Sequence, residues 1–237
     1  MQILKDIYQV GGDLNGITFD GVDAGYNDCN TYIIARPDGL IMFDTGCGGT
    51  MEQIFRNMHY WGLNPDDIKY CLVTHPHYDH AGGGYLLKER GVKFISITET
   101  ADAVFKGDDR TCPYLYHKKF HPFEVDTIVS DGEKINLLGI DFEVMHLPGH
   151  SMGCTAYFFD HGEKRISVSG DVIGTLLDGY HGWSGSIDFS KEKYLESLRR
   201  FSKIDTDIML PGHGMIYFHK PRRRVEEALN LALIEWR

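Results

Sequence analysis

The chain has 237 residues, of which 42% are hydrophobic and 24% are charged, values typical of a soluble globular protein. Its formal net charge of −10 disfavours a nucleic-acid partner, and no apolar run reaches the roughly 18 residues of a membrane span. The amino end lacks a signal-peptide pattern, and the five cysteines are scattered without a CxxC pair. We therefore expect a cytoplasmic protein without a nucleic-acid or membrane partner.

The first half of the chain alternates predicted strands and helices. Apolar runs at 33–35 and 40–43 flank the sequence RPDG, which is typical of a tight turn between two strands. Apolar residues at helical spacing predict a helix over 50–61 that ends at Gly62. A buried strand over 68–74, a helix over 81–90 and a strand over 93–98 are expected next.

The second half has shorter alternating runs, which indicate an antiparallel sheet. These runs occupy residues 133–138, 140–147, 155–159 and 165–169. A helix over 189–203, a strand over 207–210 and a helix from about 221 follow, the last with a solvated basic start at Lys220, Arg222, Arg223 and Arg224. Because no linker or repeat interrupts this pattern, we expect one α+β domain over residues 1–237, with two packed sheets and helices outside.

Residues 73–83 read VTHPHYDHAGG and place three histidines and an aspartate directly after a predicted buried strand. Imidazole nitrogens and carboxylate oxygens are common ligands of zinc and similar metals. In an extended segment His75 and His77 can point toward one place, while Asp79 and His80, after the turn, can point toward a second place nearby. The segment therefore predicts metal ligands rather than solvated or core histidines.

Three later junctions between a strand and a loop each end in another residue that can bind a metal. They are MHLPGHSMG with His150, SVSGDVIG with Asp171, and IMLPGHGM with His213. A glycine lies within one or two residues of each, which allows a sharp turn and a close approach of the backbone to a bound group. Together with the first cluster these junctions supply five histidines and two aspartates, enough for two metal positions.

The motifs THPHYDHAGG, LPGHSMG, SGD and LPGHG match those of the metallo-β-lactamase superfamily in order and spacing, and the chain resembles that superfamily from about Tyr32 to His213. The resemblance implies an αββα four-layer sandwich that holds two divalent metal ions at one edge between the sheets. Zinc is the expected metal, with iron or manganese as alternatives. The implied ligands are His75, His77 and His150 for one ion and Asp79, His80 and His213 for the other, with Asp171 bridging the two.

The resemblance also implies a reaction. Two metals about 3.5–4 Å apart can lower the pKa of a shared water toward about 7 and so supply a hydroxide nucleophile. Asp79 can accept a hydrogen bond from that hydroxide and help to move its proton, as the superfamily suggests. Asp44, in the segment FDTG, resembles a carboxylate that orients a ligand beneath the site, with capping of the next turn as the alternative. The predicted reaction is metal-dependent hydrolysis of a small molecule.

The substrate is less closely defined. Asp171 separates the chain from true β-lactamases, which have Cys or Ser there, and makes it similar to glyoxalase II thioesterases and N-acyl homoserine lactonases. About 24 residues follow His213, too few for the glutathione-binding domain of glyoxalase II, and Gly174 stands where the lactonases have Tyr. We expect an ester, thioester or lactone. A phosphodiester, iron-dependent oxidation as in persulfide dioxygenases, and a binding module without turnover are the alternatives.

Two segments, residues 108–123 and 175–186, are predicted to shape the substrate pocket. Both combine aromatic residues with a lack of periodicity, and packing of a long loop onto the domain is the alternative for each aromatic side chain. The candidate lining residues are Tyr114, Tyr116, Tyr180 and Trp183, while His117, His121 and His181 are expected to be ordinary loop histidines. A homo-oligomer is compatible with the sequence.

Overall fold

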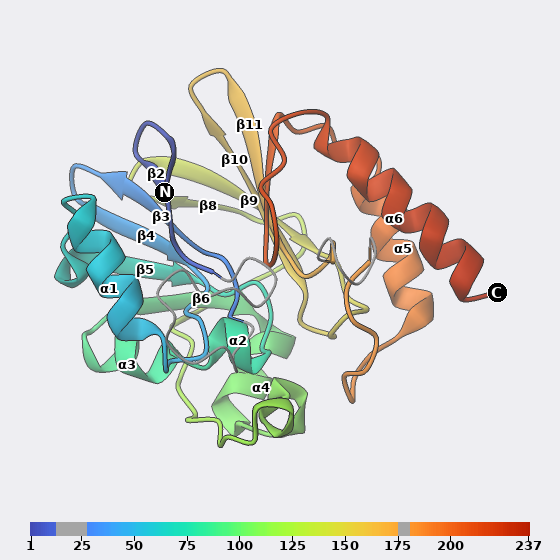
Figure 1. Ribbon diagram of the computed structural model, residues 1–237, viewed down its shortest axis with the longest axis horizontal. Coiled ribbons are helices and arrows are strands. Elements are labelled where there is room, and N and C mark those ends of the chain that lie inside the picture. The colour runs from blue at the N-terminus through green and yellow to red at the C-terminus, as the bar shows by residue number, and fades with distance from the viewer. Residues whose placement is uncertain (13–27, 175–180) are drawn as a thin grey trace.

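Figure 1 shows a computed structural model of the protein, in which residues 1–12, 28–174 and 181–237 are described. Within these residues the strands form two sheets that pack face to face, and helices cover both outer faces. This arrangement confirms the predicted α+β class and the αββα sandwich.

The first sheet has the strand order β1-β2-β3-β4-β5-β6-β7 in the described part of the chain. Its strands are β1 (Gln2–Leu4), β2 (Ile7–Gly11), β3 (Thr31–Arg36), β4 (Gly39–Phe43), β5 (Ile68–Leu72), β6 (Lys93–Ile97) and β7 (Thr127–Val129). Strands β1 to β4 are antiparallel, and β4 to β7 are parallel. The sequence RPDG turns the chain between β3 and β4, as predicted, because Arg36 pairs with Gly39.

The second sheet has the order β12-β11-β10-β9-β8 over the described residues. Its strands are β8 (Lys134–Leu137), β9 (Ile140–His146), β10 (Thr155–His161), β11 (Lys164–Gly170) and β12 (Ile208–Pro211). Strands β8 to β11 form the antiparallel sheet that the alternating runs predicted, and β12 joins β11 in parallel.

Helices cover the outer face of each sheet (Figure 1). They are α1 (Met51–Tyr60), α2 (Tyr78–Ala81), α3 (Gly84–Glu89), α4 (Thr98–Lys106), α5 (Lys191–Phe201) and α6 (Pro221–Glu235), with short 3-10 turns η1 (Pro65–Asp67), η2 (Asp109–Thr111) and η3 (Pro113–Tyr116). The helix predicted over 81–90 is instead two short helices that begin at Tyr78. Sequence analysis did not predict α4, β1, β2 or β7.

Neighbouring apolar residues of each strand point into different layers, which explains the continuous apolar runs. Ile34 and Phe43 pack between the two sheets, whereas Ile33 and Met42 pack under α1 on the outer face. In β10, Phe159 lies between the sheets and Phe158 lies under α5 and α6. Burial on both faces makes the sandwich rigid, so the loops at its edge are held on a firm support.

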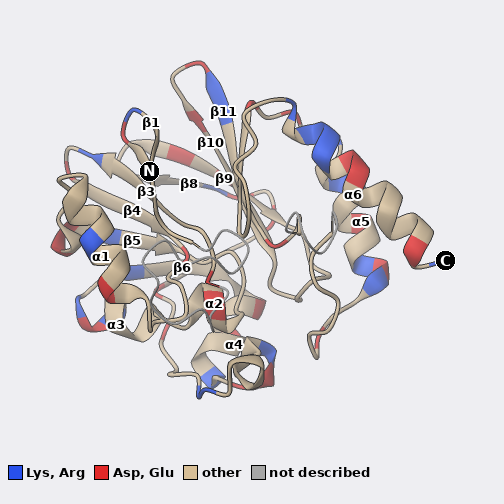
Figure 2. Ribbon diagram, viewed as in Figure 1, with Lys and Arg blue, Asp and Glu red and all other residues tan. Residues whose placement is uncertain are grey.

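Figure 2 shows basic residues at the start of α6 followed by acidic ones, and Arg222, Arg223 and Arg224 each pair with an acidic side chain. Arg222 contacts Asp205 and Glu226, and Arg223 contacts Glu227. Exposed pairs of this kind contribute little stability, and they offset the charge of the three arginines. None of the helices among the described residues is long and apolar enough to cross a membrane.

Candidate metal centre

The seven predicted ligands come from loops and turns at one edge of the sandwich. His75 and His77 follow β5, and Asp79 and His80 lie in α2, directly after them. The other three residues, His150, Asp171 and His213, follow β9, β11 and β12. Because β9, β11 and β12 run in the same direction, their carboxyl ends meet at the same edge, which explains how distant motifs converge.

His75, His77 and His150 form the first triad, whose candidate ligand atoms all lie within 4.8 Å of one another. The His150 Nε2 atom is 3.0 Å from His77 Nδ1. All three side chains are buried. Three imidazoles that face one another in this way provide the nitrogen ligands that zinc accepts.

Asp79, His80 and His213 form the second triad, which satisfies the same 4.8 Å criterion. His213 Nε2 lies 3.0 Å from Asp79 Oδ2 and 3.3 Å from His80 Nε2. His80 is fully buried, whereas the side chains of Asp79 and His213 remain 10% and 13% exposed. The second triad, together with Asp171 at 14% exposed, is therefore the part of the centre that is most open to solvent.

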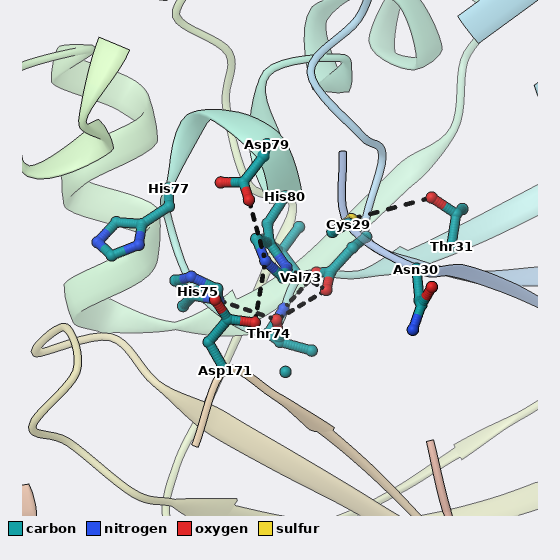
Figure 3. A network of polar contacts seen from close by, with 12 residues as sticks. Cys29, Asn30, Thr31, Val73, Thr74, His75, His77, Asp79, His80 and Asp171 are labelled. Atoms are coloured by element: carbon teal, nitrogen blue, oxygen red, sulfur yellow. Dashed lines mark hydrogen bonds and ion pairs between the residues drawn. The ribbon is translucent and has the colours of Figure 1, made fainter. Parts of the chain in front are cut away.

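Asp171 lies between the two triads, and Figure 3 shows its carboxylate directed toward His75 and His80. One oxygen, Oδ1, is 3.3 Å from His80 Nε2, and the other, Oδ2, is 3.6 Å from His150 Nε2 and 3.5 Å from His213 Nε2. A single carboxylate thus reaches nitrogen atoms of both triads. Gly212 makes this approach feasible, since a Cβ atom there would lie 2.2 Å from Asp171 Oδ1.

Hydrogen bonds fix the orientation of three of the histidine rings. His80 Nδ1 donates to Asp44 Oδ2 at 2.8 Å, and His150 Nδ1 donates to the Trp183 carbonyl at 2.8 Å. Asp44 also accepts from the Thr74 hydroxyl, whose oxygen is 3.2 Å from His75 Nδ1. A proton held on Nδ1 leaves the Nε2 lone pair free for a metal. Asp44 therefore contacts one predicted ligand, His80, directly and a second, His75, through Thr74.

The buried atoms of the centre fit a bound cation. His75 Nε2 and His77 Nε2 are buried and have no hydrogen-bond partner, and Asp171 Oδ1 has only the His80 ring nearby, at 3.3 Å. Buried polar atoms are normally paired, and His75 and Asp171 belong with His80 to a group whose candidate ligand atoms lie within 4.8 Å of one another, so this group fits a bound cation. His77 differs from the other rings because its Nδ1 faces the triad. The set of nitrogen and carboxylate oxygen atoms suits zinc and also iron.

The two triads differ in their electrostatics. Burial lowers the pKa of His75, His77 and His150, that of His77 to about 3, so these rings are neutral. In the second triad burial also opposes protonation, but neighbouring acidic groups outweigh it and raise the pKa of His80 and His213, the latter to about 9. Burial would raise the pKa of Asp79 and Asp171, yet these two rings lower both. Without a metal, protonated His80 and His213 thus attract the ionised carboxylates of Asp79 and Asp171.

Several supporting groups were not found by sequence reasoning. The Cys29 thiol lies beside Asp44 and His80, and burial raises its pKa so that it stays protonated. The Thr74 hydroxyl and the Trp183 carbonyl, described above, also act on ligand rings. A backbone carbonyl carries no signal in residue type, and the contacts of Cys29 join segments far apart in the chain, so neither could be read from a motif.

The aromatic candidates lie at different distances from the centre. The Trp183 ring is 40% exposed and 6.5 Å from the His77 ring. Tyr116 is half-buried and hydrogen-bonds to Asp79, and burial followed by the charge of Asp79 raises its pKa. Tyr114 is exposed and donates to the Cys112 thiol. Tyr180 lies outside the described residues.

The predicted loop histidines have contacts away from the seven predicted ligands. His181 contacts Glu235 at 2.7 Å, and the exposed His121 stacks on Tyr85. His117 is exposed in the turn after η3.

Comparison with known proteins identifies the family. Residues 24–213 match the sequence model of the metallo-beta-lactamase superfamily. The chain belongs to the metallo-β-lactamase superfamily. It is similar to a hydroxyacylglutathione hydrolase of Haemophilus influenzae, with 30% identity over 179 residues that cover 70% of this chain and 77% of that protein. It is also similar to an acyl-coenzyme A thioesterase of Bos taurus, with 27% identity over 216 residues, 79% of this chain and 73% of that one.

Two further relatives, from Aspergillus fumigatus and Penicillium aethiopicum, are about twice as long as the part that matches. Among solved structures, a metallo-β-lactamase of Cronobacter sakazakii superposes with a TM-score of 0.78 and covers 100% of this chain and 96% of that one, at 21% identity. That similarity supports the fold alone. The family match and its hydrolase relatives make this chain a metal-dependent hydrolase.

Proposed function

We propose that the protein is a dinuclear metal-dependent thioesterase that acts on a small organic thioester. The observation that carries this proposal is the placement of Asp171 between two triads, within 3.3–3.6 Å of nitrogen atoms in both. Among the ester, thioester and lactone classes that the sequence left open, the relatives favour the thioester, because one is a thioesterase and another hydrolyses hydroxyacylglutathione.

The proposed ligands follow the two triads. His75, His77 and His150 would hold one ion, and Asp79, His80 and His213 the other, with Asp171 shared. When bound, two divalent ions, which we propose to be zinc, would activate a water for attack, polarise the acyl carbonyl and stabilise the departing thiolate. This chemistry needs no serine or cysteine nucleophile from the protein.

The chain's own residues would orient the reactants. Asp79 lies on the solvent-accessible side, and its carboxylate could accept the proton of the attacking water. The Tyr116 hydroxyl bonded to Asp79 would hold that carboxylate in place. On the side of the first triad, the exposed Trp183 ring offers an apolar surface for an acyl group. The substrate would therefore lie across the more open second triad.

A substrate panel tests the proposal. The zinc-loaded protein would be assayed with a hydroxyacylglutathione, an acyl-coenzyme A, an aryl ester, an N-acyl homoserine lactone and bis-p-nitrophenyl phosphate. We expect kcat/KM to be highest for a thioester, measured as thiol release, with activity lost on chelation and restored by Zn²⁺. Preferential cleavage of the phosphodiester or lactone, or no turnover with two metals bound, would contradict the proposal. Oxygen uptake by iron-loaded protein with a persulfide would favour the oxidoreductase alternative.

A further inference from the structure

Two backbone segments of the loop between β11 and α5 meet at the hydroxyl of one buried tyrosine. Tyr194, in α5, is fully buried. Its hydroxyl lies 2.8 Å from the Val172 carbonyl and 3.2 Å from the Asp171 carbonyl, and it accepts a hydrogen bond from the Gly182 N–H at 2.5 Å. The hydroxyl thus donates to the backbone at Asp171 and Val172 and accepts from Gly182, so it links these two segments of the backbone.

That second segment fixes a metal-facing histidine. The Trp183 carbonyl, directly after Gly182, accepts the hydrogen bond from His150 Nδ1. The Ser186 hydroxyl, a little further along, donates to the His150 carbonyl at 2.6 Å. A displacement of the 182–183 backbone would therefore move the acceptor that sets which nitrogen of His150 faces the first triad.

The tyrosine ring itself has little freedom. Trp236 packs against it with ring centres 5.5 Å apart, and the His181 and Phe189 rings both lie 6.3 Å away. On another side Gly149, adjacent to His150, approaches so closely that a Cβ atom would lie 2.3 Å from the Tyr194 Cα. The hydroxyl is thus held in a fixed position relative to both segments.

We propose that Tyr194 is a positioning residue of the metal centre, which couples the shared carboxylate Asp171 to the first-triad ligand His150. The inference rests on the proposed ligand assignment, but it does not depend on the nature of the substrate. Removal of the hydroxyl would leave the buried Gly182 N–H and the Val172 carbonyl without their partner, and both segments would relax to new positions.

The test is Tyr194→Phe, which keeps the ring and deletes the hydroxyl. Zinc affinity would be measured by competition with a chromogenic chelator, and zinc content by elemental mass spectrometry. We expect affinity to fall about 10–100-fold, as for other outer partners of metal ligands, with kcat lowered more than KM is changed. The metal-free variant should melt close to the metal-free parent. Tyr157→Phe is the matched control, because it removes a buried hydroxyl that donates to the Val73 carbonyl, and it should keep the parent's zinc affinity.

Zinc affinity and content equal to those of the parent would overturn the inference. A metal-free Tyr194→Phe protein that no longer unfolds cooperatively would also overturn it, because the hydroxyl would then serve the core rather than the centre. Because this test measures metal binding, it can contradict the role of Tyr194 without contradicting the proposed thioesterase activity. If the parent protein binds two zinc ions but cleaves no thioester, only the proposed function is contradicted.

Discussion

The two triads of the centre are built from similar residues but are stabilised in different ways. The first triad contains three neutral imidazoles, and the second contains an aspartate with two histidines whose pKa values are raised. The rings of the first triad are uncharged and meet in one hydrogen bond, between His77 Nδ1 and His150 Nε2, so a bound cation would add most to the cohesion of this triad. The second is held by ion pairs and by Asp44 even before a metal arrives.

Under the proposed assignment, this difference means that the two metal positions would make different demands on the protein. Neutral rings in a dry environment bind a cation without first losing protons. The second triad would have to exchange protons for the metal, and it is more exposed to solvent than the first. Asp171 lies within 3.3–3.6 Å of nitrogen atoms in both triads, so a change in one triad would act on the other through this carboxylate.

The largest expected effect comes from breaking the first triad. His77→Ala removes one of its three ligands and should lower kcat/KM more than 100-fold, beyond the usual 10–100-fold cost of losing an outer partner. The fold should survive, because His77 lies in a loop at the edge of the sheets. Elemental analysis should find about one zinc per chain instead of two. His59→Ala, on an exposed part of α1, is the control and should be unaffected. Full activity of His77→Ala would exclude His77 as a ligand.

A smaller effect is expected from the support of the second triad. In Asp44→Asn, the amide nitrogen can donate to His80 Nδ1, which shifts the ring proton to Nε2 and blocks the metal-facing atom. We expect a 10–100-fold loss of zinc affinity at the second triad, seen as a second, weaker step in a zinc titration. Asp126→Asn, which changes a carboxylate that accepts the Phe94 N–H, is the matched control. Unchanged two-site binding in Asp44→Asn would show that Asp44 only caps its turn.

The smallest effect concerns pH. In metal-free protein the raised pKa of His213, about 9, contributes stability that is fully present below about pH 6.5 and is lost as the pH rises through about 9. The three histidines of the first triad are buried in their neutral form, because burial lowers their pKa. The unfolded chain gains protons there below about pH 6.5, so the stability of the fold is also lost as the pH falls below that value. The melting temperature of metal-free protein should therefore fall by a few degrees between pH 6.5 and 9.

Zinc-loaded protein should behave differently over the same range, because protons no longer compete for the second triad. Its melting temperature should stay level or rise between pH 6.5 and 9 in a thermal scan. Parallel curves for the metal-free and loaded proteins would mean that His80 and His213 do not exchange protons for metal.

The ligand residues could be predicted because their chemistry is local in the sequence. His75, His77, Asp79 and His80 lie within six positions, and His150, Asp171 and His213 each follow a strand with a glycine beside them. The sandwich followed from apolar runs buried on both faces. The placement of these seven residues together agrees with the prediction, whereas their role as ligands and the single domain over 1–237 remain predictions, as does a cytoplasmic location.

The supporting structure could not be predicted in the same way. In the sequence Tyr194 occupies an apolar position of a helix, and only the folded chain shows that its hydroxyl joins two backbone segments of the loop before that helix. The Trp183 carbonyl acts through the backbone, so its residue type gives no signal. Short elements such as β1, β7 and α4 have too few residues for a clear period, and neighbouring strands and helices decide their conformation.

The most direct test of the two-triad centre is a zinc-edge anomalous difference map from crystals grown with excess Zn²⁺. It should show two peaks about 3.5–4 Å apart, one among His75, His77 and His150, the other among Asp79, His80 and His213, with Asp171 touching both. A single peak, or none, with the histidine rings turned away from one another, would contradict it.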